Sequence, residues 1–340
     1  MRYIMLALLL GGYANSTAQQ MGKKDVVAEN MLLLQRSYGG WSKFFNKKKV
    51  EYNRTLTATE RQLAEQQKDA NDATIDNQAT SKEIRYLLHA YHETKDNRYL
   101  IAVKKGIDYL LKAQYPNGGW PQYFPDTHLY RSEITYNDNA MINVLRIMED
   151  IAKQQNGFGV LDRAYVDKAN KAVDKGIHCI LKTQVVLHGK KTIWAAQYDK
   201  DTLQPAKARA YELPSLATSE SSDILLFLMD QPPSAATREA IEAGIRWFEE
   251  HQIPNKEAII IQDAQQSSGK DRILVDKPGV DSWARFYDLQ HQEPLFVGRD
   301  GIPHRQLADI ENERRVGYGW YGTWGKKLKK AYERWKSNTP

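Results

Sequence analysis

The chain has 340 residues, of which 41% are hydrophobic and 26% charged, as is ordinary for a soluble globular protein. One cysteine, Cys179, excludes an internal disulfide, and beyond the N-terminal segment no run is apolar enough to span a membrane. The net charge of +6 suits either a solvated surface or a polyanionic partner, and charge alone does not separate the two.

The first predicted element is a signal peptide at residues 1–18. Arg2 precedes the apolar run Tyr3–Leu10 and the small-residue segment Ser16–Ala18, which is the three-part pattern of a secretory signal. The apolar run is too short to cross a bilayer, so cleavage is favoured over a retained anchor. We therefore expect an exported protein, periplasmic or secreted, whose mature chain at 19–340 forms one domain.

Helical periodicity dominates the mature chain, and it repeats. Hydrophobic residues recur at i, i+3, i+4 and i+7 in predicted helices at 81–94 and 140–153, and a third such helix is expected at 223–230. A second helix follows each of these and contains a glycine-to-glutamine segment of constant length: Gly106–Gln114, Gly176–Gln184 and Gly244–Gln252. The glycines lie 70 and 68 residues apart, and a weaker fourth copy ends at Gln35.

This repeat predicts a mainly α fold of three helical hairpins. Such hairpins bury their apolar faces only by packing side by side. We expect them to close into an α/α toroid, with an open bundle as the alternative. The last third adds short strands near 258–261 and 272–275, extended chain at 283–301 and a terminal helix at 324–336. These elements are expected to pack on or beside the toroid.

Acidic residues recur at the start of each hairpin. Asp76 in Ile-Asp-Asn aligns with Asp138 in Asn-Asp-Asn, and Glu220 takes the third position. Capping of the helix N-terminus is one explanation, because Asp, Asn and Ser are favoured there. In a toroid the same ends share one rim, where the carboxylates could converge. Oxygen ligands in loops suit calcium, and a carboxylate pair equally suits a glycoside hydrolase.

Basic residues form two further candidate sites. Residues 204–214 alternate cations with alanine between two prolines, and a period of two places Lys207 and Arg209 on one side. A solvated loop is the alternative for this segment. Arg285 and Arg299 lie among aromatic residues in turn-rich chain, which suits bidentate recognition of carboxylates.

Together these segments resemble the family 10 polysaccharide lyases, the pectate lyases of α/α toroid type. The resemblance runs in order over nearly all of the mature chain, through Thr74–Asn77, Asn117–Gln122, Tyr136–Met141, Pro205–Glu212, Trp283–Asp288 and Gly298–Gly301. Gln78 stands where a glycine is expected, and Ala217-Thr218 replaces Ser-Gly. Neither departure removes a proposed catalytic group.

The resemblance implies Ca²⁺-dependent cleavage of polygalacturonate by β-elimination. Arg209 would be the Brønsted base that removes the C5 proton, and Asp76 and Asp138 would serve the active site and bind Ca²⁺. The residues expected to bind substrate are Lys207, Arg285, Arg299, Trp120 and Glu220. Because arginine normally keeps its proton up to a pKa of roughly 12, nearby cations must depress the pKa of Arg209, which predicts an alkaline optimum.

Two other functions remain open from the sequence. A hydrolase on the same fold would use Asp76 and Asp138 as acid and base on an acidic polysaccharide. A non-catalytic protein would bind acidic sugar without turnover. In every case the expected partner is a pectic or similar acidic polysaccharide. Neither nucleic acid nor a membrane is an expected partner, and the chain is expected to be a monomer.

Overall fold

The computed structural model describes residues 25–338, so the predicted signal peptide at 1–18 lies outside the described residues. The chain is 46% helical with short strands, which confirms the predicted mainly α class. Within the described range, no helix is both long and apolar enough to cross a membrane.

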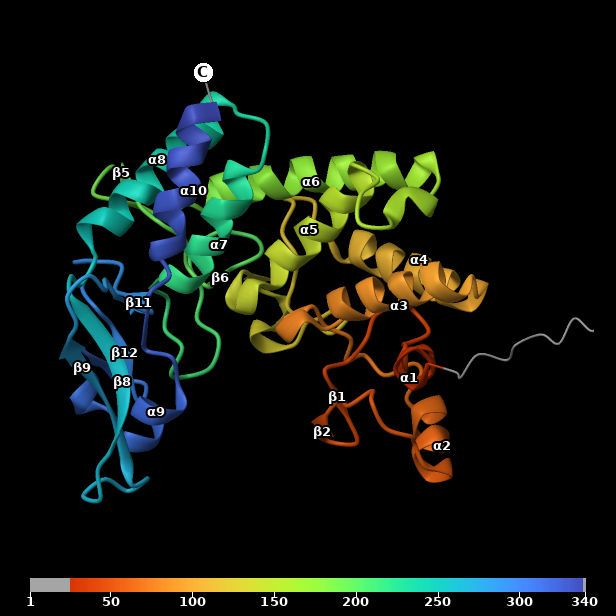
Figure 1. Ribbon diagram of the computed structural model, residues 1–340, viewed down its shortest axis with the longest axis horizontal. Coiled ribbons are helices and arrows are strands. Elements are labelled where there is room, and N and C mark those ends of the chain that lie inside the picture. Colours follow the sequence, from red (N-terminus) through yellow and green to blue (C-terminus); the bar gives the residue numbers. More distant parts are fainter. Residues whose placement is uncertain (1–24, 339–340) are drawn as a thin grey trace, which may run out of the picture.

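Three helix hairpins form the body of the molecule (Figure 1). They pair α3 (Ser81–Thr94) with α4 (Asn97–Ala113), α5 (Ala140–Ala152) with α6 (Arg163–Thr183), and α7 (Thr218–Met229) with α8 (Ala235–Glu250). Each hairpin packs on the next, α3 on α5 and α5 on α7, with α4, α6 and α8 in the same order. The predicted hairpins are confirmed, and closure into a complete toroid stays a prediction.

Further helices flank this body. α1 (Val26–Leu34) packs on the first hairpin and on α2 (Ala58–Gln66), while α10 (Lys326–Asn338) packs on α7. Buried apolar side chains from α1 through α10 form one connected core. The helical body therefore continues at both ends beyond the three hairpins.

The repeated glycines mark the closest approach of the two helices within a hairpin. A Cβ built on Gly176 of α6 would lie 2.4 Å from Leu145 Cδ2 of α5, and one on Gly244 would lie 2.8 Å from Leu225 Cδ2. Only a residue without a side chain lets these helices pack so tightly. The repeat in the sequence is thus a packing requirement.

We call each copy of the repeat a module, and the repeated glutamines join each module to the next. Each side-chain amide donates to two carbonyls, one in the following turn and one in the next outer helix: Gln35 to Gly39 and Ala102, Gln114 to Gly118 and Ala172, and Gln184 to Thr192 and Ala240. Gln252, the last of the series, lines a hollow beside residues of α10. Each amide therefore ties the turn that follows one helix to the outer helix of the next module.

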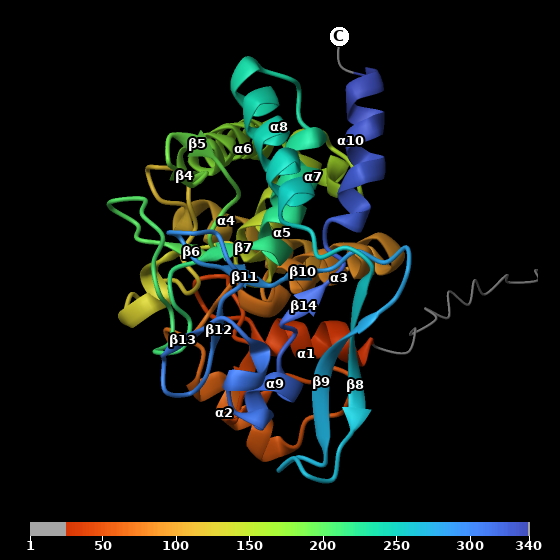
Figure 2. The ribbon, with the colours of Figure 1, turned by 90° about the vertical axis from the view of Figure 1, so that its left-hand side faces the viewer.

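Short strand pairs and one long hairpin complete the fold. The pairs are β1 (Phe44–Phe45) with β2 (Lys48–Lys49), β3 (Ile134–Thr135) with β6 (Gln197–Tyr198), β4 (Val186–Leu187) with β5 (Lys190–Lys191), β7 (Leu216–Ala217) with β11 (Phe286–Tyr287), β10 (Trp283–Ala284) with β14 (Tyr321–Gly322), and β12 (Phe296–Val297) with β13 (Pro303–His304). The long antiparallel hairpin joins β8 (Lys256–Gln262) to β9 (Lys270–Asp276), with Ile259 opposite Ile273. Figure 2 shows it beside the short helix α9 (Asn312–Gly317).

One helix begins earlier than the sequence predicts. α7 starts at Thr218, whereas the apolar pattern predicts a start at residue 223. Tertiary contacts explain the difference, because the Thr218 hydroxyl donates to Ala284 O at 2.8 Å and the Ser222 hydroxyl donates to Trp324 O at 3.0 Å. Polar residues that read as a loop therefore form the first turn of a buried helix.

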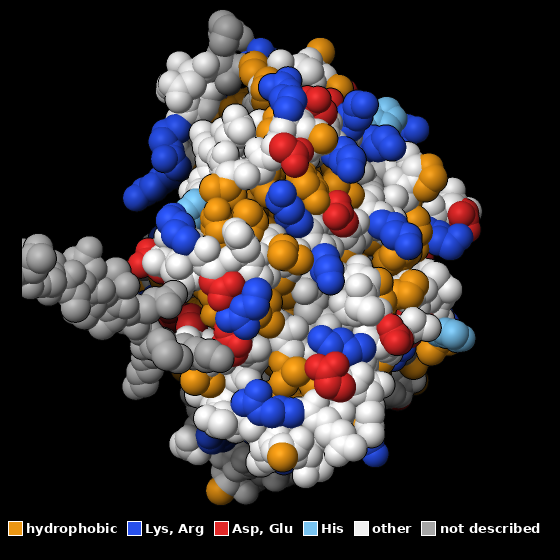
Figure 3. Space-filling view, turned by 90° about the vertical axis from the view of Figure 1, so that its right-hand side faces the viewer, with side chains coloured by type: hydrophobic (Ala, Val, Ile, Leu, Met, Phe, Trp, Pro, Cys, Tyr) orange, Lys and Arg blue, Asp and Glu red, His pale blue; other side chains and the backbone are white. Residues whose placement is uncertain are grey.

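The face on the side of α4 and α6 carries cationic and acidic side chains intermingled with hydrophobic ones (Figure 3). Such mixing is typical of a solvated surface.

Candidate active site

A cleft of about 220 Å³ opens between the starts of α3 and α5 and the loops of the C-terminal third. Two 3-10 turns, η1 (Asp76–Gln78) and η3 (Asn137–Asn139), line one side. We call this the acid side. The other side, which we call the arginine side, contains Arg209, Tyr211 and Tyr318. Asp76, Asp138 and Arg209 all line this one cleft.

Equivalent backbone hydrogen bonds fix the start of each hairpin. The carbonyls of three buried tryptophans accept them: Trp41 from Thr74 N, Trp120 from Thr135 N and Trp194 from Ala217 N, at 3.0, 3.1 and 2.8 Å. Asn77, Asp138 and Glu220 each follow the N–H donor of their module by three residues. Asn77 and Asp138 also share a left-handed backbone, with φ of 50° and 52°.

The predicted alignment of the acids is therefore off by one residue for Asp76. The structural equivalent of Asp138 in the first module is Asn77, and Asp76 precedes it. Capping does not explain either aspartate, because the N-cap residues of α3 and α5 are Thr80 and Asn139. Left-handed conformations of non-glycine residues are strained, and such strain gathers at functional sites.

Asp76 is 2% exposed and has one oxygen without a partner. Its Oδ2 accepts from the Lys43 ammonium, and its backbone N–H donates to the Thr74 hydroxyl at 3.0 Å. Oδ1 is buried with no hydrogen-bond partner among the described residues. A buried, unpartnered carboxylate oxygen is unfavourable unless a cation or donor meets it. Asp76 therefore suits the binding of a further positive charge.

Asp138 is more open, with its side chain 41% exposed. Burial raises the pKa of this carboxyl, and the negative charges of Asp76 and Glu220 raise it further. Nη2 of Arg285 lies 3.9 Å from Asp138 Oδ1, and its positive charge only partly offsets the repulsion from these two carboxylates. A cation placed between Asp76 and Asp138 would relieve it.

Glu220 and Arg285 form a buried ion pair. Arg285 Nη2 donates to Glu220 Oε1 at 2.6 Å, and the side chains are 14% and 1% exposed. Although burial alone would lower the pKa of Arg285, its acidic neighbours raise it. Glu220 thus orients Arg285 and has no surface to offer a sugar, so its predicted contact with substrate does not fit its burial. For Arg285, carboxylate binding stays a prediction.

Arg209 lies at the edge of the cleft with its side chain 53% exposed. Its Nε donates to Glu212 Oε2 at 2.8 Å and its Nη2 donates to Oε1 of the same carboxylate at 2.5 Å. This bridge raises the pKa of Arg209, whereas the sequence predicts that neighbouring cations depress it. That expectation is wrong, because the charge that contacts Arg209 is the carboxylate of Glu212, three residues away.

The remaining predicted substrate residues are dispersed. A turn from Arg209 to Glu212 replaces the predicted extended chain, and Lys207 is exposed and does not line the cleft. Trp120 is fully buried and its indole donates to Leu110 O at 2.7 Å, so its role is in the core. Arg299 pairs with Glu313 at 2.8 Å beside the ring of Tyr211.

Sequence reasoning missed Arg314, which lies between the rings of Tyr211, Tyr318 and Trp320 at 4.7, 5.1 and 5.1 Å from their centroids. Arg314 is 8% exposed, and its Nε is buried with no hydrogen-bond partner in the described chain. Burial lowers the pKa of Arg314, and the nearby Arg299 lowers it further. A buried, under-coordinated guanidinium suits a carboxylate ligand.

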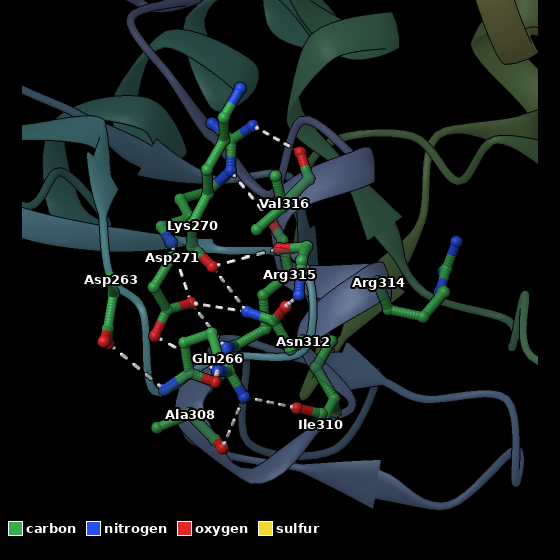
Figure 4. A network of polar contacts seen from close by, with 12 residues as sticks. Asp263, Gln266, Lys270, Asp271, Ala308, Ile310, Asn312, Arg314, Arg315 and Val316 are labelled. Atoms are coloured by element: carbon green, nitrogen blue, oxygen red, sulfur yellow. Dashed lines mark hydrogen bonds and ion pairs between the residues drawn. The ribbon is translucent and has the colours of Figure 1, made fainter.

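The next residue, Arg315, explains why Arg314 stays in place (Figure 4). Its guanidinium donates to Asp271 Oδ1 at 2.7 Å, to Gln266 Oε1 at 2.6 Å and to Ile310 O at 2.8 Å. This network anchors α9 to the β8–β9 hairpin, and Figure 4 shows Arg314 pointing away from it. The sequence offered one signal for this division of roles, namely that Arg314 and Arg315 are adjacent. Arg315 serves the fold, and Arg314 serves the cleft.

Lys43 and Tyr123 were also missed, and both line the acid side. The Lys43 ammonium lies 5.9 Å from the centroid of Tyr123, and the guanidinium of Arg131 lies 4.9 Å from it. Burial opposes a charge on Lys43, but its ion pair with Asp76 outweighs burial and raises the pKa of Lys43. An internal cation therefore accompanies Asp76.

Asp76 and Asp138 are the residues that could hold a metal ion. Within residues 25–338 no group of three or more His, Cys, Asp or Glu side chains is arranged to do so. Two carboxylates beside Asn77 and Asn137 fit calcium as part of a shell whose other oxygens come from water or ligand. The unpartnered Oδ1 of Asp76 and the raised pKa of Asp138 agree with a cation here.

Comparisons with known proteins place the chain in a family. The family model described as pectic acid lyase matches residues 35–329. The family 10 polysaccharide lyase of Cellvibrio cellulosa has a solved structure with 31% sequence identity and a TM-score of 0.79, which covers 91% of each chain. A mutant of that enzyme in complex with trigalacturonic acid has the same identity and TM-score and covers 91% of this chain and 92% of its own. No curated protein matches the sequence. The chain therefore belongs to the pectic acid lyase family and is a polysaccharide lyase.

Proposed function

We propose that this lyase cleaves polygalacturonate by calcium-dependent β-elimination, with Arg209 as the base at C5. One observation carries the proposal: Asp76, Asp138 and Arg209 line the same cleft, and Arg299 and Arg314 lie against the ring of Tyr211, which lines it as well. Asp76 and Asp138 suit a cation, whereas Arg209, Arg299 and Arg314 suit the carboxylates of an acidic polysaccharide. The complex of the Cellvibrio relative with trigalacturonic acid supports this substrate class.

The chemistry requires both sides of the cleft. The C5 proton is weakly acidic because C5 bears a carboxylate, which resists a second negative charge. Bound calcium would neutralise that carboxylate and stabilise charge that develops beside it. Arg209 takes the C5 proton. The electron pair of the broken C5–H bond forms the C4–C5 double bond, and the C4–O4 bond breaks. The departing oxygen takes a proton and leaves as the new chain end.

Arg209 must first be released from Glu212. The bridge holds the proton on the guanidinium, because it raises the pKa of Arg209. Substrate that displaces Glu212 would leave Arg209 near the cations Arg299 and Arg314, which share the ring of Tyr211 with it. Like charges favour loss of the proton, so the base becomes competent only in the loaded cleft.

The decisive test follows product formation from polygalacturonate with and without calcium. An unsaturated product that absorbs in the near ultraviolet, lost on chelation and restored by calcium, is the expected result. Saturated products, formed equally well with a chelator, would instead identify a hydrolase that uses Asp76 and Asp138 as acid and base. Binding without turnover would identify a sugar-binding protein.

Export and a monomeric state are part of the same proposal. The charged, apolar and small-residue pattern of residues 1–18 supports removal of a signal peptide. Sequencing the N-terminus of the exported protein should give a start close to residue 19. Light scattering of the purified mature chain should give the mass of one chain.

A further inference from the structure

Three guanidiniums converge on one aromatic ring in the cleft. The central carbons of Arg314, Arg299 and Arg209 lie 4.7, 4.9 and 5.2 Å from the centroid of Tyr211. Each comes from a different part of the chain: α9, the turn after β12, and the loop that precedes β7. Tyr211 itself is half-buried and lines the cleft.

Such a gathering of like charges needs a stabilising cause. Two members have carboxylate partners, Arg209 with Glu212 and Arg299 with Glu313. Arg314 has a buried Nε without a partner among the described residues. The electron-rich face of an aromatic ring attracts cations, most strongly where water is excluded. The ring of Tyr211 is therefore the feature that all three share.

The surrounding backbone keeps the three arginines beside the ring. The Arg315 network fixes α9, so Arg314 is held at the cleft (Figure 4). Gly301, with φ of +75°, brings the turn after β12 against the Tyr211 loop, where a Cβ would lie 3.0 Å from Ala210 O. The chain thus delivers all three guanidiniums to one place before any ligand arrives.

We propose that Tyr211 is a positioning residue whose ring holds Arg209, Arg299 and Arg314 in register for the uronate carboxylates of the substrate. The inference rests on the proposed function and adds a role for a residue that carries no charge. The ring contacts the guanidiniums and leaves their N–H edges directed at carboxylate oxygens, which are those of Glu212 for Arg209 and of Glu313 for Arg299, while Nε of Arg314 has no partner among the described residues. Its aromatic character matters here, and its hydroxyl is secondary.

Matched variants separate the ring from the hydroxyl. Tyr211→Phe keeps the ring, whereas Tyr211→Leu removes it, and Tyr211→Gln is a second ringless variant of similar length should the first fold poorly. Thermal melting of each protein confirms folding. The first readout is the equilibrium affinity for trigalacturonate without calcium, which is independent of turnover.

The ringless variants should bind trigalacturonate about tenfold more weakly, and Tyr211→Phe within about twofold of the wild type. KM for polygalacturonate should follow the same order. Because Tyr211 acts through Arg314, combining Tyr211→Leu with Arg314→Met should weaken binding less than the two single effects multiplied.

Three outcomes overturn the inference: wild-type affinity in Tyr211→Leu, an equal loss in Tyr211→Phe, or independent effects in the double variant. Each of these leaves the proposed function intact provided that the wild-type enzyme forms unsaturated product. If the wild-type enzyme forms no unsaturated product, the proposed function is wrong whatever the Tyr211 variants show.

Discussion

The two sides of the cleft are built in different ways. On the acid side, a repeated hydrogen bond from a tryptophan carbonyl sets the backbone of each hairpin start, so Asn77 and Asp138 occupy equivalent positions. On the arginine side, Arg209, Arg299 and Arg314 come from unrelated segments and meet at one ring. The repeated structure therefore positions the groups of the acid side, and contacts that occur once in the chain position those of the arginine side.

The two sides also differ in how their own ion pairs balance charge. Asp76 is matched by Lys43 on the acid side, and Arg209 and Arg299 are matched by Glu212 and Glu313 on the arginine side. A ligand that binds Arg209 or Arg299 therefore competes with Glu212 or Glu313, whereas Asp76 keeps an unpartnered Oδ1 beside its bond to Lys43. The exceptions, Asp138 and Arg314, are the groups whose pKa values the fold moves against their charged forms. They should gain most from a ligand.

The largest effect is expected at Arg209. Arg209→Lys keeps a positive charge but loses the geometry of the proposed base, so kcat should fall about a thousandfold or more. The assay follows near-ultraviolet absorbance with saturating polygalacturonate. Lys207→Met is the matched control, because Lys207 is exposed outside the cleft, and it should keep near-wild-type kcat. Retention of a tenth of the activity in Arg209→Lys would remove it as the base.

Asp138→Asn should reduce kcat/KM about a hundredfold through loss of a metal ligand. The raised pKa of Asp138 means that its charge destabilises the fold above that pKa, since protons bind more tightly in the folded state. The variant should therefore melt no lower than the wild type at neutral pH with chelator. Only the wild type should gain Tm with calcium.

Asp167→Asn, on the exposed surface of α6, controls for loss of a carboxylate elsewhere. It should keep both the activity and the calcium-dependent rise in Tm. A calcium response in Asp138→Asn as large as that of the wild type would show that the metal binds at another place.

Arg314→Met should raise KM for polygalacturonate about ten- to a hundredfold, in line with a hydrogen bond to a charged group. Its stability should not fall, because the fold already disfavours the buried guanidinium charge. Arg131→Met gives the comparison on the acid side, where Arg131 also packs on a tyrosine but is paired with Asp126. Similar changes in KM for both variants would abolish the distinction between the two sides.

The smallest effect concerns the pH profile. Glu212 raises the pKa of Arg209, so Glu212→Gln should lower it and move the rise of kcat/KM with pH about one unit toward acid. Glu313→Gln, which frees Arg299 instead, should leave the position of that rise unchanged. A shift toward alkali in Glu212→Gln would mean that this carboxylate helps to remove the proton.

Periodicity predicted the helices well, because apolar spacing and the glycine-to-glutamine segments report local packing. α3 begins and ends where the sequence places it, and the strand-like run near residue 259 pairs with the one near 273. Asp76, Asp138 and Arg209, which the sequence proposes as site residues, line one cleft, and their roles stay predictions. What failed depends on tertiary contacts: the one-residue offset of Asp76, the burial of Trp120 and the bridge between Arg209 and Glu212 are invisible to spacing.

The glutamine series gives the molecule a direction. Each module supplies the amide, and the module after it supplies the carbonyl of an equivalent alanine, Ala102, Ala172 or Ala240, so the contact always runs from one module to the next along the chain. The series ends at Gln252, which lines a hollow beside residues of α10, the helix that packs on α7. The same amide contact therefore sets the order of the modules from α1 to α8.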